Sequence, residues 1–126
     1  MKRKLLSIAA AAACAFGGAA QAQISDGIVK IGVLNDMSGL YSDITGPGSL
    51  SAARMAVEDY VKATGSKLKI EVVGADHQNK PDVGSNVARQ WVDTDKVDMI
   101  ADVPTSSVGL DVAKMARHKG KLQVNS

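Results

Sequence analysis

The sequence predicts an α/β protein in which a parallel sheet is covered by helices on both faces. Three observations predict this class. Beyond the first 22 residues, short β-branched runs alternate with amphipathic segments of helical period. The strand–helix pair recurs at intervals of about 30 residues, the usual length of a βαβ unit. Gly, Pro and Ser gather at the junctions, where loops are expected.

The first strand–helix unit begins at a buried apolar run. Residues 28–36 (IVKIGVLND) predict a strand, and residues 37–48 predict a glycine-rich loop. Ser49 or Ser51 is expected to cap a helix that ends just before Gly65. The apolar residues on one face of this helix are Leu50, Ala53, Val57, Tyr60 and Val61.

The second unit repeats the pattern. Residues 68–75 (LKIEVVGA) predict a strand, residues 76–81 a polar turn, and Asp82 is expected to cap the next helix. The apolar residues on one face of this helix are Val83, Val87, Ala88, Trp91 and Val92. Trp91 is therefore expected to pack in the core.

The third unit completes the alternation. Residues 97–103 predict a strand, 104–107 a loop, 108–119 a helix and 121–124 a fourth strand. In a parallel sheet of this kind, ligands bind beyond the carboxyl ends of the strands, where the strand order reverses. We therefore expect a binding site among the loops that follow the strands.

The first 22 residues predict a secretory signal peptide. Basic residues at positions 2–4 precede a short apolar run at 5–16, and the small-x-small sequence AQA ends at Ala22. The apolar run is too short for a helix that spans a hydrocarbon core of about 30 Å, which disfavours an uncleaved anchor. Cleavage near Ala22 would leave residues 23–126 outside the cytoplasmic membrane, in the periplasm.

Charge and cysteine content narrow the class of protein. The chain has 15 basic and 13 acidic side chains, and three of the basic ones lie in the leader, so the mature part has a slight acidic excess. No basic patch remains that would indicate nucleic-acid binding. The single cysteine, Cys14, also lies in the leader, so no disulfide is expected. Lipidation of Cys14, which would anchor the protein, stays open as an alternative.

Motifs for cofactor, metal or nucleophile chemistry are weak. The run GPGSLS at 46–51 superficially fits a dinucleotide fingerprint, but its glycines begin ten residues after Asp36 instead of directly after the strand. A flexible loop at the entry to a helix is the better interpretation. His77 and His118 lack partners at metal-ligand spacing, and no G-x-S-x-G elbow is present. We expect no cofactor and no metal, and His77, at a strand end, is a candidate to line a cleft.

The hydroxyl cluster, Thr105, Ser106 and Ser107, is the most informative polar group. It follows a buried strand and precedes a helix, so hydroxyls and unpaired backbone N–H groups are expected to converge there. Such an arrangement binds a carboxylate without a charged side chain. Alternatively, one of the three hydroxyls caps the helix. In the loop after the first strand, Ser38 and Tyr41 are further candidates, because an aromatic face can cover an apolar ligand group.

Two long segments resemble one known family. IVKIGVLNDMSGLYSDITGPGSLSAARMAVED (28–59) and ADHQNKPDVGSNVARQWVDTDKVDMIADVPTSS (75–107) are similar to branched-chain amino-acid-type periplasmic binding proteins, the solute receptors of ABC importers. The resemblance implies a Rossmann-like lobe of the type I periplasmic binding protein fold. Such receptors have two lobes and need about 300 residues. Residues 23–126 are thus expected to be the amino-terminal part of the first lobe of a truncated chain.

The resemblance also implies a function. Such a receptor captures a small carboxylate-bearing solute by closure of two lobes and delivers it to a membrane permease, so we expect no enzymatic activity. By position, the hydroxyl cluster would bind the solute's carboxylate, with Ser106 as the leading candidate, and Tyr41 and Ile44 would lie against its side chain. Pro104 and the long loop at 40–47 depart from the family pattern and leave amino acids, amides and aromatic acids open.

Two other functions stay open at this stage. The same fold could be the ligand-binding domain of a transmembrane sensor, which a membrane-spanning helix after the second lobe would reveal. An exported enzyme is the other alternative, and turnover of candidate solutes would separate it from a receptor. A cytoplasmic repressor is disfavoured by the signal peptide and by the lack of a helix-turn-helix.

Overall fold

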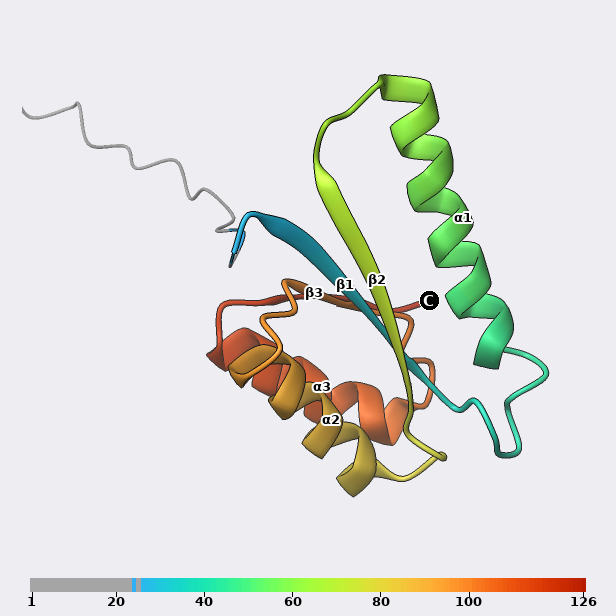
Figure 1. Cartoon of the computed structure of the whole chain (residues 1–126). Coiled ribbons are helices and arrows are strands. Elements are labelled where there is room, and N and C mark those ends of the chain that lie inside the picture. The colour runs from blue at the N-terminus through green and yellow to red at the C-terminus, as the bar shows by residue number, and fades with distance from the viewer. Residues whose placement is uncertain (1–23, 25) are drawn as a thin grey trace, which may run out of the picture.

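The computed structural model describes Ile24 and residues 26–126, so the predicted signal peptide lies outside the described residues. Four strands and three helices alternate along this part of the chain (Figure 1). In chain order they are β1 (Ile28–Asn35), α1 (Gly46–Thr64), β2 (Lys69–Asp76), α2 (Pro81–Asp93), β3 (Met99–Ala101), α3 (Ser106–His118) and β4 (Leu122–Val124). The predicted α/β class and the order of its elements are confirmed.

The strands form one parallel sheet in the order β2-β1-β3-β4. β1 pairs over its whole length with β2, from Ile28 opposite Lys69 to Asn35 opposite Asp76. On its other side β1 pairs with the short strand β3. Because all strands run in the same direction, their carboxyl ends lie at one edge of the sheet, which we call the carboxyl edge.

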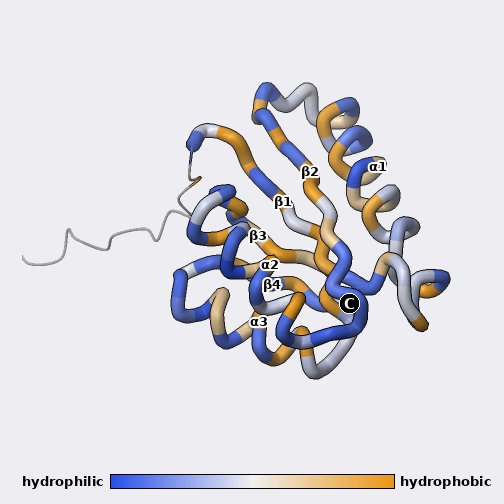
Figure 2. Tube along the Cα trace, turned by 60° about the horizontal axis from the view of Figure 1, so that its bottom comes forward, coloured by the Kyte–Doolittle hydropathy of each residue, from blue (hydrophilic) through white to orange (hydrophobic). Residues whose placement is uncertain are grey.

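Helices cover both faces of the sheet. α1 lies on one face, and α2 and α3 lie side by side on the other (Figure 1; Figure 2). Alternation along β2 shows the same division: a side chain at Gly74 would meet Leu50 of α1, whereas Val73 and Ala75 pack against the core on the opposite face.

The main core lies between the sheet and the α2–α3 layer. Its buried residues are Leu34, Ala88, Trp91, Val97, Ile100, Val103, Val108 and Val112. The predicted core position of Trp91 is confirmed, since only 7% of the residue is exposed. α1 buries far less, and its one fully buried residue is Gly46.

The start of α1 differs from the prediction. The helix begins at Gly46, earlier than expected, and neither Ser49 nor Ser51 caps it. Pro47 explains the early start, because proline has a helical φ and its missing N–H is not needed in the first turn. The Ser51 hydroxyl donates back to the Pro47 carbonyl instead.

The start of α2 shows the same effect. Lys80, not Asp82, occupies the N-cap position, and Pro81 is the first helical residue. Asp82 lies in the first turn, where its negative charge still interacts favourably with the positive end of the helix dipole.

The third unit has a shorter strand and a longer helix than expected. β3 has three residues, although Val97 and Val103 on either side of it are buried. Asp102 ends the strand because its φ of 56° takes the chain out of the extended conformation. α3 begins at Ser106, so two members of the hydroxyl cluster lie in its first turn.

Candidate functional site

The carboxyl ends of β1 and β3 mark the point where the strand order reverses. From β1 the chain passes through α1 to β2 on one side, and it later reaches β3 on the other side. The connections after β1 and β3 therefore lead to helices on opposite faces of the sheet, and sheets of this kind bind their ligands at such a point. Candidate residues from both connections come to this place.

The first connection, residues 36–45, is called the first loop here. Asp36 is fully buried, and its carboxylate accepts hydrogen bonds from the backbone N–H groups of Gly39 (2.8 Å) and Tyr41 (3.1 Å). A side chain at Gly39 would lie 2.6 Å from both carboxylate oxygens, so the close approach requires glycine. Asp36 thus holds the loop in a tight turn.

A second carboxylate, that of Asp76 at the end of β2, ties the first loop to the neighbouring strand. It accepts hydrogen bonds from the Met37 N–H (2.9 Å), the Ser38 hydroxyl (2.5 Å) and the Gln78 N–H (2.7 Å). Burial alone would raise the pKa of Asp76, but these hydrogen bonds and the nearby His77 outweigh it and lower the pKa. Asp76 is therefore ionised at neutral pH.

The first loop presents apolar side chains to solvent. Leu40 is 81% exposed, Tyr41 40% and Ile44 80%. The backbone beneath them is ordered by the Tyr41 carbonyl, which accepts hydrogen bonds from the N–H groups of Ile44 and Thr45. Tyr41 and Ile44, both predicted from the sequence, are thus held on a well-defined turn at the carboxyl edge.

The hydroxyl cluster begins α3. Thr105 is the N-cap residue, but its side chain makes no capping hydrogen bond, and Ser106 and Ser107 are exposed. The first turn contains no acidic side chain. Three hydroxyls and the free N–H groups of the helix start therefore lie together, at the positive end of the helix dipole. The sequence predicts that a carboxylate binds there, and this role stays a prediction.

His77 lies elsewhere. It is fully buried, and its Nδ1 accepts a hydrogen bond from the Asn79 N–H (3.0 Å). Its Nε2 is also buried and has no hydrogen-bond partner within the described residues. Burial lowers the pKa of His77 more than the charges of Asp36 and Asp76 raise it, so the ring is neutral. The predicted lining role finds no support in this interior position.

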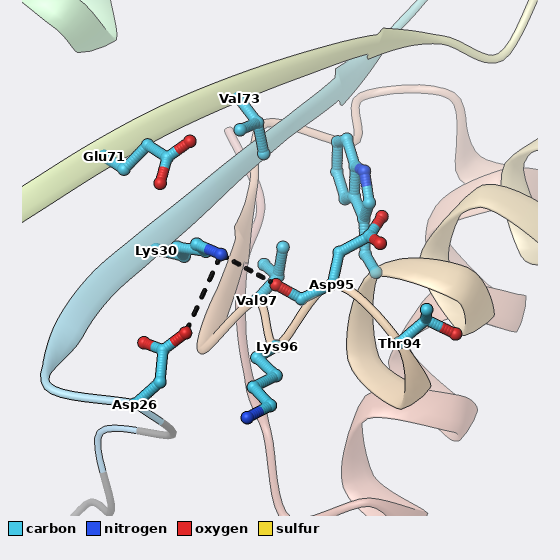
Figure 3. A pocket seen from close by; sticks show the side chains of 9 residues that line it. Asp26, Lys30, Glu71, Val73, Thr94, Asp95, Lys96 and Val97 are labelled. Atoms are coloured by element: carbon cyan, nitrogen blue, oxygen red, sulfur yellow. Dashed lines mark hydrogen bonds and ion pairs between the residues drawn. The ribbon is translucent and has the colours of Figure 1, made fainter.

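Two cavities in the described residues lie away from these candidates. One, of about 470 Å³, is at the opposite, amino edge of the sheet, where Lys30 contacts Asp26 and the carbonyl of Asp95 (Figure 3). Trp91 also lines this cavity. The other, of about 440 Å³, lies between α3 and β4.

The described residues contain neither a metal-ligand cluster nor a helix able to span a membrane. No group of three or more His, Cys, Asp or Glu side chains there is placed to hold a metal ion. None of the helices in this part of the chain has the length and apolar character needed to cross a membrane.

The sequence did not lead us to two polar residues at the carboxyl edge, Asn35 and Asp102. Asn35 is fully buried at the end of β1, and its amide donates to the carboxylate of Asp102 (2.9 Å). One sequence pattern could have identified them: each is a polar residue at the end of an apolar strand, in LND at 34–36 and in ADV at 101–103. Such residues are expected to gather where parallel strands end.

The chain belongs to the periplasmic binding protein family, whose profile matches residues 28–126. The fold is that of a lobe of a type I periplasmic binding protein. This is a family of solute-binding proteins and not of enzymes. The search of curated proteins found no match.

Solved structures of this class align with most of the chain. A periplasmic binding protein from Burkholderia mallei is 42% identical with a TM-score of 0.72, over 79% of this chain and 26% of that one. A branched-chain amino acid ABC transporter periplasmic ligand-binding protein from Burkholderia xenovorans LB400 is 40% identical with a TM-score of 0.69. The match covers 75% of this chain and 25% of that one. A solute-binding protein of an ABC transporter from R. palustris, in complex with benzoate, is 25% identical with a TM-score of 0.61. The match covers 79% of this chain and 27% of that one.

The chain therefore spans about a quarter of the length of the solved structures that it matches.

Proposed function

We propose that this chain is the amino-terminal part of an extracytoplasmic receptor of an ABC importer. The receptor captures a small carboxylate-bearing solute between two lobes and delivers it to a membrane permease. The signal peptide predicted at 1–22 places it in the periplasm. Family membership and the two Burkholderia structures support the receptor class.

One observation supports the solute class above all others. Three hydroxyls and the free N–H groups of α3 lie at the carboxyl edge, without a side-chain cap and without an acid in the first turn. A carboxylate there would accept several hydrogen bonds and would meet the positive end of the helix dipole. Ser106 is the leading donor, flanked by Thr105 and Ser107.

The first loop supplies the apolar part of the proposed site. Tyr41 and Ile44 are exposed here, and a solute seated against the hydroxyl cluster would cover them. Closure of a second lobe would bury the remaining solute surface. Branched-chain amino acids, amides and aromatic acids all carry an apolar or planar group that such a surface can accept.

Calorimetry on the full-length protein tests the proposal, with isoleucine, leucine, glutamine and benzoate as probes. We expect binding of at least one carboxylate. Ser106→Ala should weaken it about tenfold or more, since an under-satisfied buried acceptor costs roughly 1–3 kcal/mol. Ser85→Ala, in α2, is the control and should leave the affinity unchanged. An unchanged dissociation constant for Ser106→Ala would show that the carboxylate binds elsewhere.

A further inference from the structure

Asp102 has an unusual backbone conformation for its position. It follows β3 directly and has a φ of 56°, in the left-handed region that residues with side chains seldom adopt. Such a conformation costs free energy and persists where the surrounding structure holds it in place. The contacts of this residue therefore need an explanation.

The carboxylate of Asp102 joins segments that are distant in the sequence. Its Oδ2 accepts a hydrogen bond from the Asn35 amide (2.9 Å), and its Oδ1 accepts one from the Ser126 hydroxyl (2.6 Å). The Ser49 hydroxyl of α1 also donates to it. The end of β1, the first turns of α1 and the segment after β4 thus meet at one side chain.

Asn35 extends this connection to the first loop. It is fully buried, and its amide also donates to the carbonyl of Thr45 (3.3 Å), the residue before α1. A continuous path therefore runs from Thr45, at the end of the first loop, through Asn35 to Asp102. Three residues further along the chain is Thr105, the first member of the hydroxyl cluster.

The ionisation of Asp102 fits this arrangement. Burial alone would raise the pKa of its carboxyl group, but the hydrogen bonds from Ser126, Ser49 and Asn35 outweigh it and lower the pKa. The carboxylate is therefore charged at neutral pH and accepts stronger hydrogen bonds than a neutral group would.

We infer that Asp102 is a positioning residue of the proposed solute site, which holds the first loop and the hydroxyl cluster at a fixed separation. This inference rests on the proposed function. The separation sets which solutes fit, because a solute bound to Ser106 of the second connection would have to reach Tyr41 and Ile44 on the first. Asp102 thereby sets affinity and selectivity without touching the solute.

Asp102→Asn isolates the role of the carboxylate. Asparagine has the same shape and tolerates the left-handed conformation, so the backbone need not change. It replaces an acceptor by an NH2 group and removes the charge, so Asn35, Ser49 and Ser126 can no longer all donate to it.

Asp98→Asn is a matched control at the other end of the same strand. Asp98 accepts hydrogen bonds from the Lys30 N–H (3.0 Å) and from the Lys121 ammonium (3.3 Å), at the amino edge of the sheet. Its replacement removes a comparable set of hydrogen bonds, far from the proposed site.

Hydrogen–deuterium exchange of the full-length protein without solute gives the first measurement. In Asp102→Asn, amides of residues 37–49 and 103–109 should both exchange at least about fivefold faster, since charged hydrogen bonds that close both segments are lost. In Asp98→Asn both segments should keep wild-type rates. Unchanged exchange in Asp102→Asn, or equal acceleration in both variants, would overturn the inference.

Binding of isoleucine and benzoate gives the second measurement. For whichever probe the wild type binds, Asp102→Asn should weaken binding at least about fivefold and change the ratio of the two affinities, whereas Asp98→Asn should do neither. The exchanged pair Asn35→Asp/Asp102→Asn restores one donor and one acceptor, and it should recover part of the affinity. If the wild type binds none of the four probes isoleucine, leucine, glutamine and benzoate, the proposed function fails, while the exchange measurement still decides the positioning role.

Discussion

Single carboxylates connect distant segments at the carboxyl edge of the sheet. Asp76 binds the start of the first loop to the end of β2, and Asp102 binds β1, α1 and the segment after β4. The pKa of each is lowered because hydrogen bonds to the charged form outweigh burial. Both therefore stabilise the fold at neutral pH, and this contribution is lost as the pH falls through and below the ordinary value of 3.8.

Unlike the two carboxylates, His77 is favoured by the fold in its neutral form, and it affects stability in a higher pH range. Its ring is buried in the neutral form, and burial lowers its pKa from the ordinary value of 6.5. Below 6.5 the unfolded chain binds a proton that the folded chain does not, so stability rises with pH in this range. We expect the free energy of unfolding to be lower at pH 5.5 than at pH 7.5.

Urea denaturation at both pH values measures this effect. His77→Gln, which cannot titrate, should lose less stability than the wild type between pH 7.5 and pH 5.5. If both proteins lose the same amount, the pH dependence has another source and His77 does not cause it.

At the scale of elements, close packing of α2 against β1 depends on a missing side chain. A Cβ at Gly32, in the middle of β1, would lie 2.4 Å from the Trp91 ring of α2. Glycine therefore lets the indole lie directly on the sheet. Gly84 has the same role between α2 and α3, where a Cβ would lie 2.3 Å from Val108.

Gly32→Ala should destabilise the protein by about 1–3 kcal/mol, the usual cost of overpacking a core. The free energy of unfolding in urea measures it. Gly48→Ala in α1 is the matched control, because no atom lies within 4 Å of its added methyl group. It should stabilise the helix by about 0.5–1 kcal/mol. Equal effects of the two substitutions would contradict the packing argument.

At the scale of the whole molecule, the two faces of the sheet are unequally covered. α2 and α3 cover one face, whereas α1 lies over β1 and β2 on the other (Figure 2). Leu122 and Val124 of β4 are 58% and 50% exposed. They lie on the face opposite α3, because the intervening Gln123 side chain contacts the Gly109 carbonyl of α3.

This exposed apolar surface on an edge strand favours self-association of the 126-residue chain. Val124→Lys should shift the chain toward monomer, as measured by sedimentation velocity at several concentrations. Leu110→Lys is the control, because Leu110 is equally exposed but lies on α3 and not at a sheet edge. If both substitutions, or neither, change the association, the apolar edge of β4 is not its cause.

The sequence predicted the order of elements well because each depends on local pattern. β1 and the core position of Trp91 follow from apolar periodicity and are confirmed. The predicted caps Ser49 or Ser51 and Asp82 are wrong, since Pro47 and Pro81 in the first turns favour earlier helix starts. The roles of Ser106, Tyr41 and Ile44 stay predictions, although the structure places all three at the carboxyl edge.

By itself, the sequence determined the α/β class, the alternation of strands and helices, and the placement of hydroxyls before the third helix. These are properties of neighbouring residues, which periodicity and composition record. Only the tertiary structure decided that His77 is interior and that Asn35, Ser49, Asp102 and Ser126 meet at one carboxylate. The reason is physical: strand order and register bring together distant residues such as Asn35 and Asp102, which are 67 positions apart, and no local pattern encodes that separation.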